Sequence, residues 1–420
     1  MKPAGPIPVD YRGRVDGALL IGGHDAEALI AAAGDTPLFV YDLAIVRARI
    51  ARLRHALPDV RIHYAMKANP YPPLLAGMTA LVDGFDVASA GELRRALAAG
   101  ARADAMSFAG PGKRDDELAV ALAEGVTLNL ESEGEAARAL AIAARTGRRP
   151  RLAVRVNPDF ELRGSGMRMG GGAKPFGVDA ERAAALVARV VAAGAEYRGL
   201  HIFAGSQSLD AEAIAEAQAR GCALAARIAA ESGIVPPLVN LGGGFGIPYF
   251  AGDEPLAVEA IGRALDATLA AARGTLPGTR FAIELGRWLV GEAGVYLTRI
   301  VDRKVSHGEV FLVVDGGLHH QLAASGNFGT VVRRNYPVAV AGRFGVAPEE
   351  VASIVGCLCT PLDRLADKVA LPMAAAGDVV ALFLAGAYGA SASPQAFLGH
   401  PPPREILIDG EADQPLFVRS

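Results

Sequence analysis

The chain has 420 residues, 51% of them hydrophobic and 21% charged, which allows two domains with large apolar cores and argues against disorder. Its formal net charge of -3 provides no basic surface for nucleic acid or for an anionic membrane. Three cysteines form no disulfide framework, and no apolar run reaches the ~20 residues of a bilayer span, so we expect a reducing, cytoplasmic setting without nucleic-acid or membrane partners.

The N-terminal region begins with loop-rich sequence. Residues 1–22 carry several charged side chains and no long apolar core, so we expect no signal peptide. The first predicted strand covers residues 37–42, and a predicted helix over 43–56 follows and ends before Pro58. About forty residues are too few to fold alone, so we expect residues 1–39 to join a domain that is completed later in the chain.

Beyond this helix, short β-like runs alternate with alanine-rich helical runs. The predicted strands cover residues 61–67, 84–88, 105–109, 127–130, 152–157, 198–204, 238–241 and 280–285. The predicted helices between them cover residues 92–99, 114–124, 133–145, 180–193, 211–232 and 256–273. Eight such units over about 250 residues favour a (β/α)8 barrel, an α/β fold that we place over residues 40–287. A doubly wound open sheet is the alternative that strand number does not exclude.

After Gly286 the sequence changes character, with short β-like runs separated by Gly and Pro turns and little helix. These runs cover residues 290–301, 310–314, 338–341, 352–356, 379–384 and 405–408. They predict a C-terminal, mostly antiparallel β domain, formed by residues 288–420 together with residues 1–39.

The strand predicted over residues 61–67 ends in a lysine, although the chain uses arginine far more often than lysine. A desolvated lysine can lose its proton and form a Schiff base, which arginine cannot do. The ordinary alternative is a lysine that reaches from a strand end to solvent, and this stretch alone favours that alternative.

Polar residues follow every strand of the predicted barrel. In strand order they are Lys67; Asp86 and Ser89; Gly110 and Lys113; Glu131 and Ser132; Arg155 and Asn157; Gly205, Ser206 and Gln207; Gly242, Gly243 and Gly244; and Glu284 and Arg287. The chemistry of a (β/α)8 barrel lies at the carboxyl ends of its strands. Because polar residues recur at every strand end, a functional role for Lys67 is now favoured over a lysine that only reaches solvent.

Two of these strand ends suit a phosphorylated cofactor. Three successive glycines, Gly242–Gly244, let backbone N–H groups close on an anion such as phosphate, and Ser206 could add a hydroxyl, although a flexible turn and a loop serine are the plainer alternatives. Glu284 could form a structural ion pair with Arg287, or it could keep a pyridine nitrogen protonated. A lysine, a phosphate turn and a carboxylate together suggest pyridoxal 5'-phosphate.

Ten short segments then become recognisable as a set, within a resemblance that extends from about Leu38 to Asp409. They are Tyr64–Asn69, Gly84–Leu93, Gly110–Lys113, Asn129–Ser132, Arg155–Pro158, Gly199–Gln207, Gly242–Gly244, Glu284–Arg287, Cys359–Asp363 and Gly386–Tyr388. In this order they resemble the pyridoxal-phosphate-dependent decarboxylases of the alanine racemase-like barrel fold (fold type III), which include diaminopimelate and ornithine decarboxylases. No single segment would suffice for that resemblance.

The resemblance implies a role for each matching residue. Lys67 would form the Schiff base with pyridoxal 5'-phosphate, and Glu284 would pair with its pyridine nitrogen. Further expected cofactor contacts are Asp86, Arg155, Phe203, Ser206, Gly243, Gly244, Gly286, Arg287 and Tyr388. Expected substrate contacts are Arg287, Thr360, Asp363, His319 and Tyr388. The resemblance also implies a homodimer with shared active sites, in which Cys359 acts in the site of the partner subunit and, like Lys67, is a candidate proton donor to Cα.

The sequence departs from the family in three places. Phe203 stands where the family usually has a histidine stacked on the cofactor ring. Thr360 follows the cysteine where amino-acid-specific members carry Glu or Asp for the distal amine of the substrate. The stretch Asp315–Gly326 lacks the Arg and Tyr with which diaminopimelate decarboxylases hold the distal carboxylate. Losing the partners of a charged group costs specificity by orders of magnitude.

We therefore expect α-decarboxylation of a non-standard amino acid, or of one tethered to a carrier protein such as a glutamyl thioester, in a secondary-metabolism or polysaccharide pathway. Decarboxylation of meso-diaminopimelate in lysine biosynthesis is one alternative. An alanine racemase-like enzyme is another, which the Cys359 segment argues against. A catalytically dead regulator is a third, and the retained Lys67 and Glu284 argue against it.

Two pairs of residues, of types that often bind metals, remain to be considered. His319 and His320 are adjacent but have no third ligand, and Cys357 and Cys359 have no second ligand pair, so neither spacing predicts a metal site. For the two histidines we expect a polar loop near the mouth of the active site.

Overall fold

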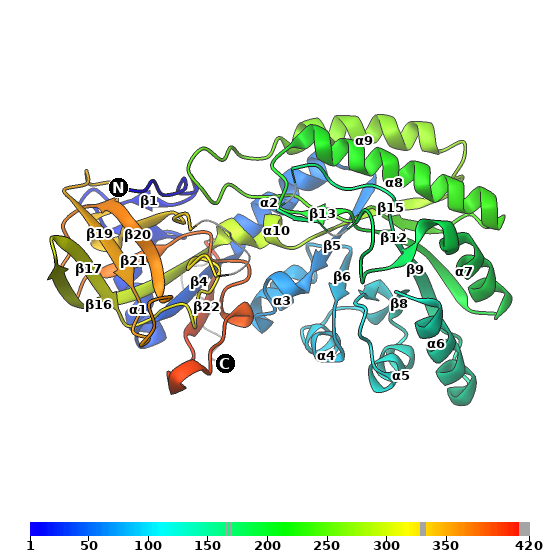
Figure 1. Ribbon diagram of the computed structural model, residues 1–420, viewed down its shortest axis with the longest axis horizontal. Helices are drawn as coiled ribbons and strands as arrows, with labels where there is room; N and C mark the ends of the chain where they lie inside the picture. Colours follow the sequence, from blue (N-terminus) through cyan, green and yellow to red (C-terminus); the bar gives the residue numbers. More distant parts are fainter. Residues whose placement is uncertain (165, 169, 328–332, 411–420) are drawn as a thin grey trace. The chain divides into compact units, whose positions relative to one another are not determined.

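The computed structural model describes residues 1–164, 166–168, 170–327 and 333–410, and the chain divides into two compact units (Figure 1). The barrel unit comprises Ile50–Ile247 and Pro255–Gly286. The β unit comprises Met1–Arg49, Pro248–Glu254 and the residues from Arg287 onward. The domain limits expected from the sequence, 40–287 with 1–39 and 288–420, stay a prediction.

Eight parallel strands of the barrel unit form a closed ring. They are β5 (Val60–Ala65), β6 (Gly84–Val87), β7 (Met106–Phe108), β8 (Thr127–Leu130), β9 (Arg151–Asn157), β12 (Glu196–Ile202), β14 (Leu238–Asn240) and β15 (Arg280–Leu285). The ring closes because β15 pairs with β5 and β8 pairs with β9. The predicted (β/α)8 barrel is thereby confirmed, and the open sheet is wrong.

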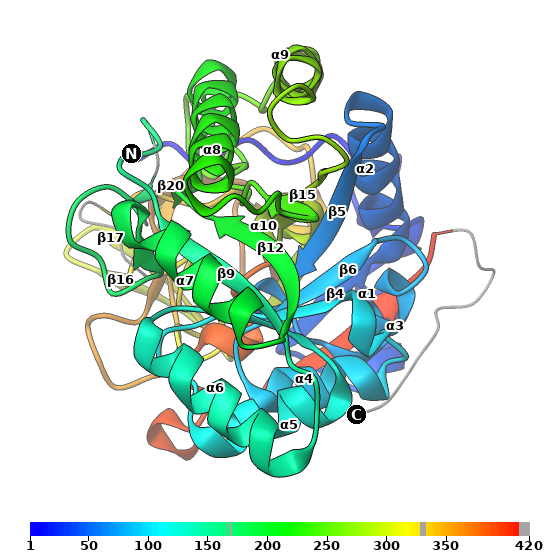
Figure 2. The same ribbon diagram turned by 90° about the vertical axis from the view of Figure 1, so that its right-hand side faces the viewer.

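Helices surround this ring of strands (Figure 2). They are α3 (Pro72–Met78), α4 (Ala90–Ala98), α5 (Asp115–Glu124), α6 (Glu133–Thr146), α7 (Ala180–Ala192), α8 (Ala211–Ser232) and α9 (Val258–Ala272), and α2 (Leu43–Ala56) precedes the first barrel strand. Apolar side chains buried at helical spacing, such as Ala183, Leu186, Val187 and Val190 of α7, fix the inner face of each helix. Two short strands make further pairings. Strand β10 (Met167–Arg168) pairs with β13 (Gly205–Ser206), and β11 (Val178–Asp179) pairs with β9.

Two of the serines that follow predicted strands serve the helices and not the site. Ser89 Oγ accepts the backbone N–H of Glu92 at the start of α4, and Ser132 Oγ accepts that of Glu135 at the start of α6. Each serine is therefore an N-cap, which satisfies a backbone donor that the helix cannot satisfy internally.

The β unit contains an eight-stranded sheet. Its strands are β4 (Leu38–Asp42), β16 (Gly294–Ser306), β17 (Glu309–Val314), β18 (Val338–Val340), β19 (Glu350–Val355), β20 (Arg364–Leu371), β21 (Val379–Leu382) and β22 (Arg404–Ile408). Five of its pairings are antiparallel, while β17–β19 and β22–β4 are parallel, so the mostly antiparallel prediction is confirmed. The unit also has β1 (Arg12–Gly13), β2 (Leu19–Ile21), β3 (His24–Asp25), α1 (Ala26–Ala33) and α10 (Arg287–Val290).

Strand β20 was missing from the sequence-based prediction. Its alternation is interrupted by Asp367 and Lys368, which a strand pattern does not favour. Asp367 is nevertheless buried, because Lys2 Nζ lies 2.5 Å from its carboxylate and Asn335 accepts its backbone N–H. Partners distant in sequence therefore make this strand possible.

Within the described ranges, no helix is both long enough and apolar enough to span a membrane.

Candidate active site

A cavity of about 350 Å³ opens in the barrel unit at the carboxyl ends of its strands. Five residues predicted for the site line it, and they are Lys67, Asp86, Arg155, Phe203 and Glu284. Loop residues Gly110–Lys113 and the side chains of Phe176 and His201 complete much of the wall. Residues far apart in sequence thus meet at the edge of the barrel where such folds carry their chemistry.

Lys67 lies just beyond its strand. Strand β5 ends at Ala65, and Lys67 belongs to a single 3₁₀ turn, Met66–Ala68, in which its two neighbours are buried while it is exposed. Tyr64 Oη donates to the carbonyl of Asn69, which fixes this turn. Lys67 Nζ lies 5.6 Å from the centre of the Phe203 ring. In the part of the chain that the structure describes, no hydrogen bond or ion pair occupies Nζ, so the amine is available to a ligand.

Glu284 is a buried carboxylate of β15 with two polar neighbours, one from the adjacent strand β14 and one from β12. Asn240 Nδ2 donates to Glu284 Oε2 at 3.1 Å, and His201 Nε2 lies 2.8 Å from the same oxygen. Burial alone raises the pKa of Glu284, but His201, Lys67 and Arg155 outweigh burial and lower it well below the usual range. Glu284 is therefore ionised at neutral pH, facing the cavity.

Sequence reasoning missed both neighbours of Glu284. His201 belongs to the Gly199–Gln207 segment, and Asn240 lies two residues before the glycine-rich turn Gly242–Gly244. The signal was a polar residue at the penultimate or last position of a buried barrel strand.

Asp86 lies at the end of β6 and lines the cavity. Ser107 Oγ donates to its Oδ1, and His63 Nδ1 lies 3.8 Å from its Oδ2. These contacts orient the carboxylate, and its expected contact with a cofactor stays a prediction.

Arg155 is held by a buried ion pair. Its Nη1 donates to Glu131 Oε1 at 2.7 Å, and its guanidinium lies 5.1 Å from the centre of the Phe176 ring. Glu131 also accepts the backbone N–H groups of Gly110 and Gly177 at 2.6 and 2.7 Å. Burial raises the pKa of Glu131, but Arg155 and Lys113 overcome that effect and lower it. Glu131 thus joins two loops of the cavity to Arg155.

Lys113 has a structural role. It is almost fully buried, and its Nζ donates to the carbonyls of Gly110 and Asn129 and, at 2.7 Å, to Glu135 Oε1. All three donors of the ammonium group are used. Of the two lysines at strand ends, only Lys67 therefore has a free amine.

The glycine-rich turn follows β14 beside Glu284. Glu284 N donates to the carbonyl of Gly242 at 2.9 Å, and a Cβ on Gly243 would lie 2.0 Å from the carbonyl oxygen of Glu284. Among the described residues, no acceptor takes the N–H of Gly243 or Gly244. Two free N–H groups in a turn that a side chain would block form a suitable anion cradle.

Several predicted residues lie beside the cavity instead of in its wall. In the described part of the chain, Ser206 in β13, Gly243 and Gly244 in the turn, and Gly286 after β15 are outside its lining. Their expected contacts with the cofactor stay predictions.

The other predicted residues belong to the β unit. Arg287 Nη1 donates to Tyr249 Oη at 3.0 Å, and its guanidinium lies 4.6 Å from the centre of the Tyr388 ring. Cys359 is exposed and Thr360 half-buried. The roles expected for them in an active site stay predictions.

Asp363 has a clear structural function in this unit. Its carboxylate accepts the backbone N–H of Leu318 at 2.6 Å and that of Leu358 at 2.9 Å. It therefore joins the loop that carries His319 to the loop that carries Cys359. Its expected contact with substrate stays a prediction.

The chain is similar to known proteins in sequence and in structure. The family model described as "Pyridoxal-dependent decarboxylase, pyridoxal binding domain" matches residues 43–291. The L-glutamyl-[BtrI acyl-carrier protein] decarboxylase of Niallia circulans is 38% identical over 380 residues, which cover 89% of each chain. The diaminopimelate decarboxylase of Methanothermobacter thermautotrophicus is 32% identical, and the match covers 94% of this chain and 92% of the relative. The crystal structure of AQ1208 from Aquifex aeolicus superposes with a TM-score of 0.83 at 28% identity. The match covers 98% of this chain and 95% of the AQ1208 chain.

The buried pair Lys113–Glu135 gives a stability prediction. Lys113→Met leaves the Glu135 carboxylate buried without its cation, so the free energy of unfolding at pH 7 should fall by about 3–5 kcal/mol. Burial already raises the pKa of Glu135. The loss should therefore shrink as pH falls from 7 toward 4.5, because a carboxyl with a raised pKa takes up its proton above 4.5. Urea unfolding monitored by circular dichroism measures both quantities.

Two variants control this experiment. Lys113→Met combined with Glu135→Leu removes both charges and should recover most of the lost stability. Lys304→Met removes an exposed lysine of β16 and should change the free energy of unfolding by less than about 0.5 kcal/mol. A double variant as unstable as Lys113→Met would contradict the role of the ion pair.

Proposed function

The chain belongs to the pyridoxal-dependent decarboxylase family, and from this premise we propose that its substrate is an amino acid carried as a thioester on a carrier protein, with a glutamyl group as the first candidate. The reaction is the decarboxylation of an amino acid with pyridoxal 5'-phosphate. What remains to be inferred is which residues hold the cofactor and which amino acid is bound.

Residues of the barrel unit fit this cofactor. An aldehyde needs an unprotonated amine, a pyridinium nitrogen needs an ionised carboxylate, and a phosphate needs unpaired N–H donors. Lys67 offers the free amine, Glu284 offers a carboxylate kept ionised by its neighbours, and the turn Gly243–Gly244 offers the donors. When bound, pyridoxal 5'-phosphate withdraws electrons from Cα of the substrate, which no protein side chain can do.

The remaining steps fall to the side chains of this chain. We infer that Lys67 would hold the cofactor through its amine, and that its Nζ, when free of the cofactor, could carry a proton to Cα. Asn240 and His201 orient the Glu284 carboxylate, and His201, with Lys67 and Arg155, keeps it charged. Phe203, on the Lys67 side of the cavity, supplies an apolar ring for stacking without a hydrogen bond.

One observation carries the substrate proposal, namely the lack of charge where the family reads the distal end of its substrates. Burial lowers the pKa of His319 and of His320 to about 4, so both rings are neutral at pH 7. Asp315 is the one acidic residue of the stretch 315–326, and Thr298 and the backbone of Arg299 already donate to its carboxylate. Thr360 adds only a hydroxyl. A neutral acyl chain suits these groups better than a free ammonium or carboxylate does.

The relatives support the same choice without deciding it. The relative at 38% identity is named for a glutamyl group on an acyl-carrier protein, and relatives at 32–35% are named diaminopimelate decarboxylases. Both substrate classes are therefore compared in the test below.

A homodimer in the cytoplasm forms part of this proposal. Cys359 is an exposed thiol on a loop that Asp363 anchors, which suits a residue that acts in the active site of the partner subunit. The substrate thioester and the free thiols are both compatible with a reducing compartment.

Release of CO2 by the purified holoenzyme tests the substrate proposal. The panel compares a glutamyl thioester on a carrier protein with free L-glutamate and free meso-diaminopimelate. We expect kcat/KM for the carrier-bound substrate to exceed both others by about 10²-fold or more, because a free distal charge would lack a partner. Turnover of free meso-diaminopimelate at an equal or higher kcat/KM would identify the chain as a diaminopimelate decarboxylase instead.

Borohydride reduction tests the role of Lys67. Reduction of the yellow holoenzyme should fix the chromophore to the peptide that contains Lys67, as mass spectrometry of a protease digest would show. Lys67→Ala should retain no chromophore after reduction and denaturation. Lys113→Arg, which keeps a cation among the same acceptors, is the matched control and should still be labelled at Lys67. Label on any other lysine would contradict the assignment.

The glycine turn gives a prediction about cofactor affinity. In Gly243→Ala the added Cβ would overlap the Glu284 carbonyl, so the turn must open and lose its arrangement of N–H donors. The Kd of pyridoxal 5'-phosphate, from absorbance titration of the apoenzyme, should rise at least about tenfold, or about 1.4 kcal/mol. Gly274→Ala, where a Cβ would meet nothing within 4 Å, should leave the Kd unchanged. An unaltered Kd in Gly243→Ala would remove the turn from the phosphate site.

A further inference from the structure

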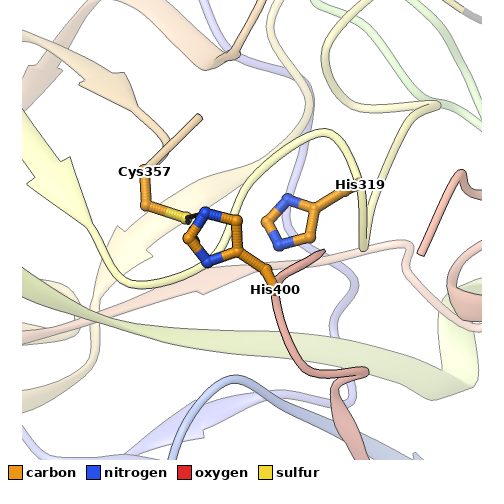
Figure 3. A group of neighbouring side chains, drawn as sticks. All are labelled: His319, Cys357 and His400. Atoms are coloured by element: carbon orange, nitrogen blue, oxygen red, sulfur yellow. Dashed lines mark hydrogen bonds between the residues drawn. The ribbon is translucent and has the colours of Figure 1, made fainter. Parts of the chain in front are cut away.

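Three potential metal ligands meet in the β unit. His319, Cys357 and His400 come from three loops, which follow β17, β19 and the turn Phe397–Gly399, and their side chains point toward one another (Figure 3). Their donor atoms all lie within 4.8 Å of one another. In the described part of the chain, this is the one such group of three histidine, cysteine or carboxylate donors.

The spacing of the donors is close to that of a zinc site. Cys357 Sγ lies 3.8 Å from His400 Nδ1 and 3.9 Å from its Nε2. With Zn–S of about 2.3 Å and Zn–N of about 2.0–2.1 Å, tetrahedral coordination places sulfur and nitrogen about 3.6 Å apart. The observed sulfur–nitrogen distance is therefore within a few tenths of an ångström of that in a zinc site. Because the sulfur is almost equidistant from both ring nitrogens, the His400 ring must also turn for one nitrogen to face a shared metal.

His319 supplies an independent observation. Its side chain is completely buried, and neither Nδ1 nor Nε2 has a hydrogen-bond partner among the described residues. A buried polar group without a partner costs about 1–3 kcal/mol, so such groups normally have a ligand, an ion or a water. The neighbouring His320 is different, because Tyr296 Oη and the carbonyl of Pro401 lie 3.0 Å from its two nitrogens.

The donor types suit a cation of the zinc class, because thiolate and neutral imidazole are ligands that zinc prefers. Burial lowers the pKa of His319 to about 4, so its ring is neutral and a nitrogen lone pair is free to bind a metal. Burial and the carboxylate of Asp363 raise the pKa of Cys357 to about 11, so without a cation this residue stays a thiol. Binding therefore breaks the S–H bond, forms a sulfur–metal bond and releases the proton to solvent. Cys357 and His400 are half-buried, which gives a cation access.

We propose that His319, Cys357 and His400 form a binding site for a divalent cation of the zinc class, with the fourth coordination position left to water or to another donor. Three protein ligands with one open position are typical of zinc sites that exchange a ligand. The proposal does not depend on the substrate of the enzyme, because every ligand belongs to the β unit and none is assigned to the cofactor. His319 was expected to contact substrate, and as a ligand it could still do so through the open position.

Cobalt titration of the holoenzyme tests this proposal, after treatment with a chelator and with spectra recorded against the metal-free holoenzyme. We expect one Co²⁺ per chain, with intense visible bands of tetrahedral cobalt and a thiolate-to-cobalt band in the near ultraviolet. Cys357→Ser should lose the thiolate band, and Cys357→Ser and His400→Gln should each weaken binding about 10²-fold or more. Cys359→Ser, two residues away in the same loop, is the matched control and should keep both bands.

A thermal measurement keeps the test decisive if one variant folds poorly. Zn²⁺ in excess of its Kd should raise the Tm of the wild-type chain and of Cys359→Ser but not that of His400→Gln. Failure of the folded wild-type chain to bind cobalt stoichiometrically would overturn the proposal. So would a thiolate band that survives Cys357→Ser or disappears in Cys359→Ser.

Discussion

The barrel site depends on keeping one carboxylate charged in the interior of the protein. Removing Glu284 from water favours its neutral form, and a neutral acid would not hold a pyridinium nitrogen. His201 on β12, together with Lys67 and Arg155, reverses that preference, and Asn240 on β14 donates to the same carboxylate oxygen. Closure of the barrel is what brings these strands together, since β12, β14, β15 and β5 are successive neighbours in the ring.

Around this carboxylate, the other buried charges are arranged in pairs that leave Lys67 free. Glu131 neutralises Arg155 and accepts two loop N–H groups, and Glu135 neutralises Lys113. Breaking either buried pair would expose an uncompensated charge to a low-dielectric interior, which is costly. The pairs therefore fix the cavity wall, whereas the Lys67 amine, on a short turn with buried neighbours, keeps the freedom to bind and release a ligand.

The β unit shows a different use of polar groups. Asp363 joins two loops through backbone N–H groups, and His320 is held by Tyr296 and Pro401, so the loops around Cys359 are fixed without a net charge directed at substrate. Neutral surroundings of this kind agree with a substrate whose distal end is an acyl chain on a carrier. They also leave His319 buried beside Cys357 and His400 with its nitrogens unpaired.

The sequence by itself determined the alternation of strands and helices and the approximate limits of all eight barrel strands, because these are set by local periodicity. Its short motifs also singled out Lys67, the turn Gly242–Gly244 and Glu284 as candidates for a cofactor site. It did not determine that Ser89 and Ser132 cap helices or that Lys113 donates to three buried acceptors. Nor did it determine that Lys2 pairs with Asp367 in β20. The partners of Glu284 and the group His319, Cys357 and His400 were decided only by the tertiary structure. Their members lie between about forty and eighty residues apart in the chain, and spacing along a sequence carries no information about side chains that meet only when distant strands and loops pack together.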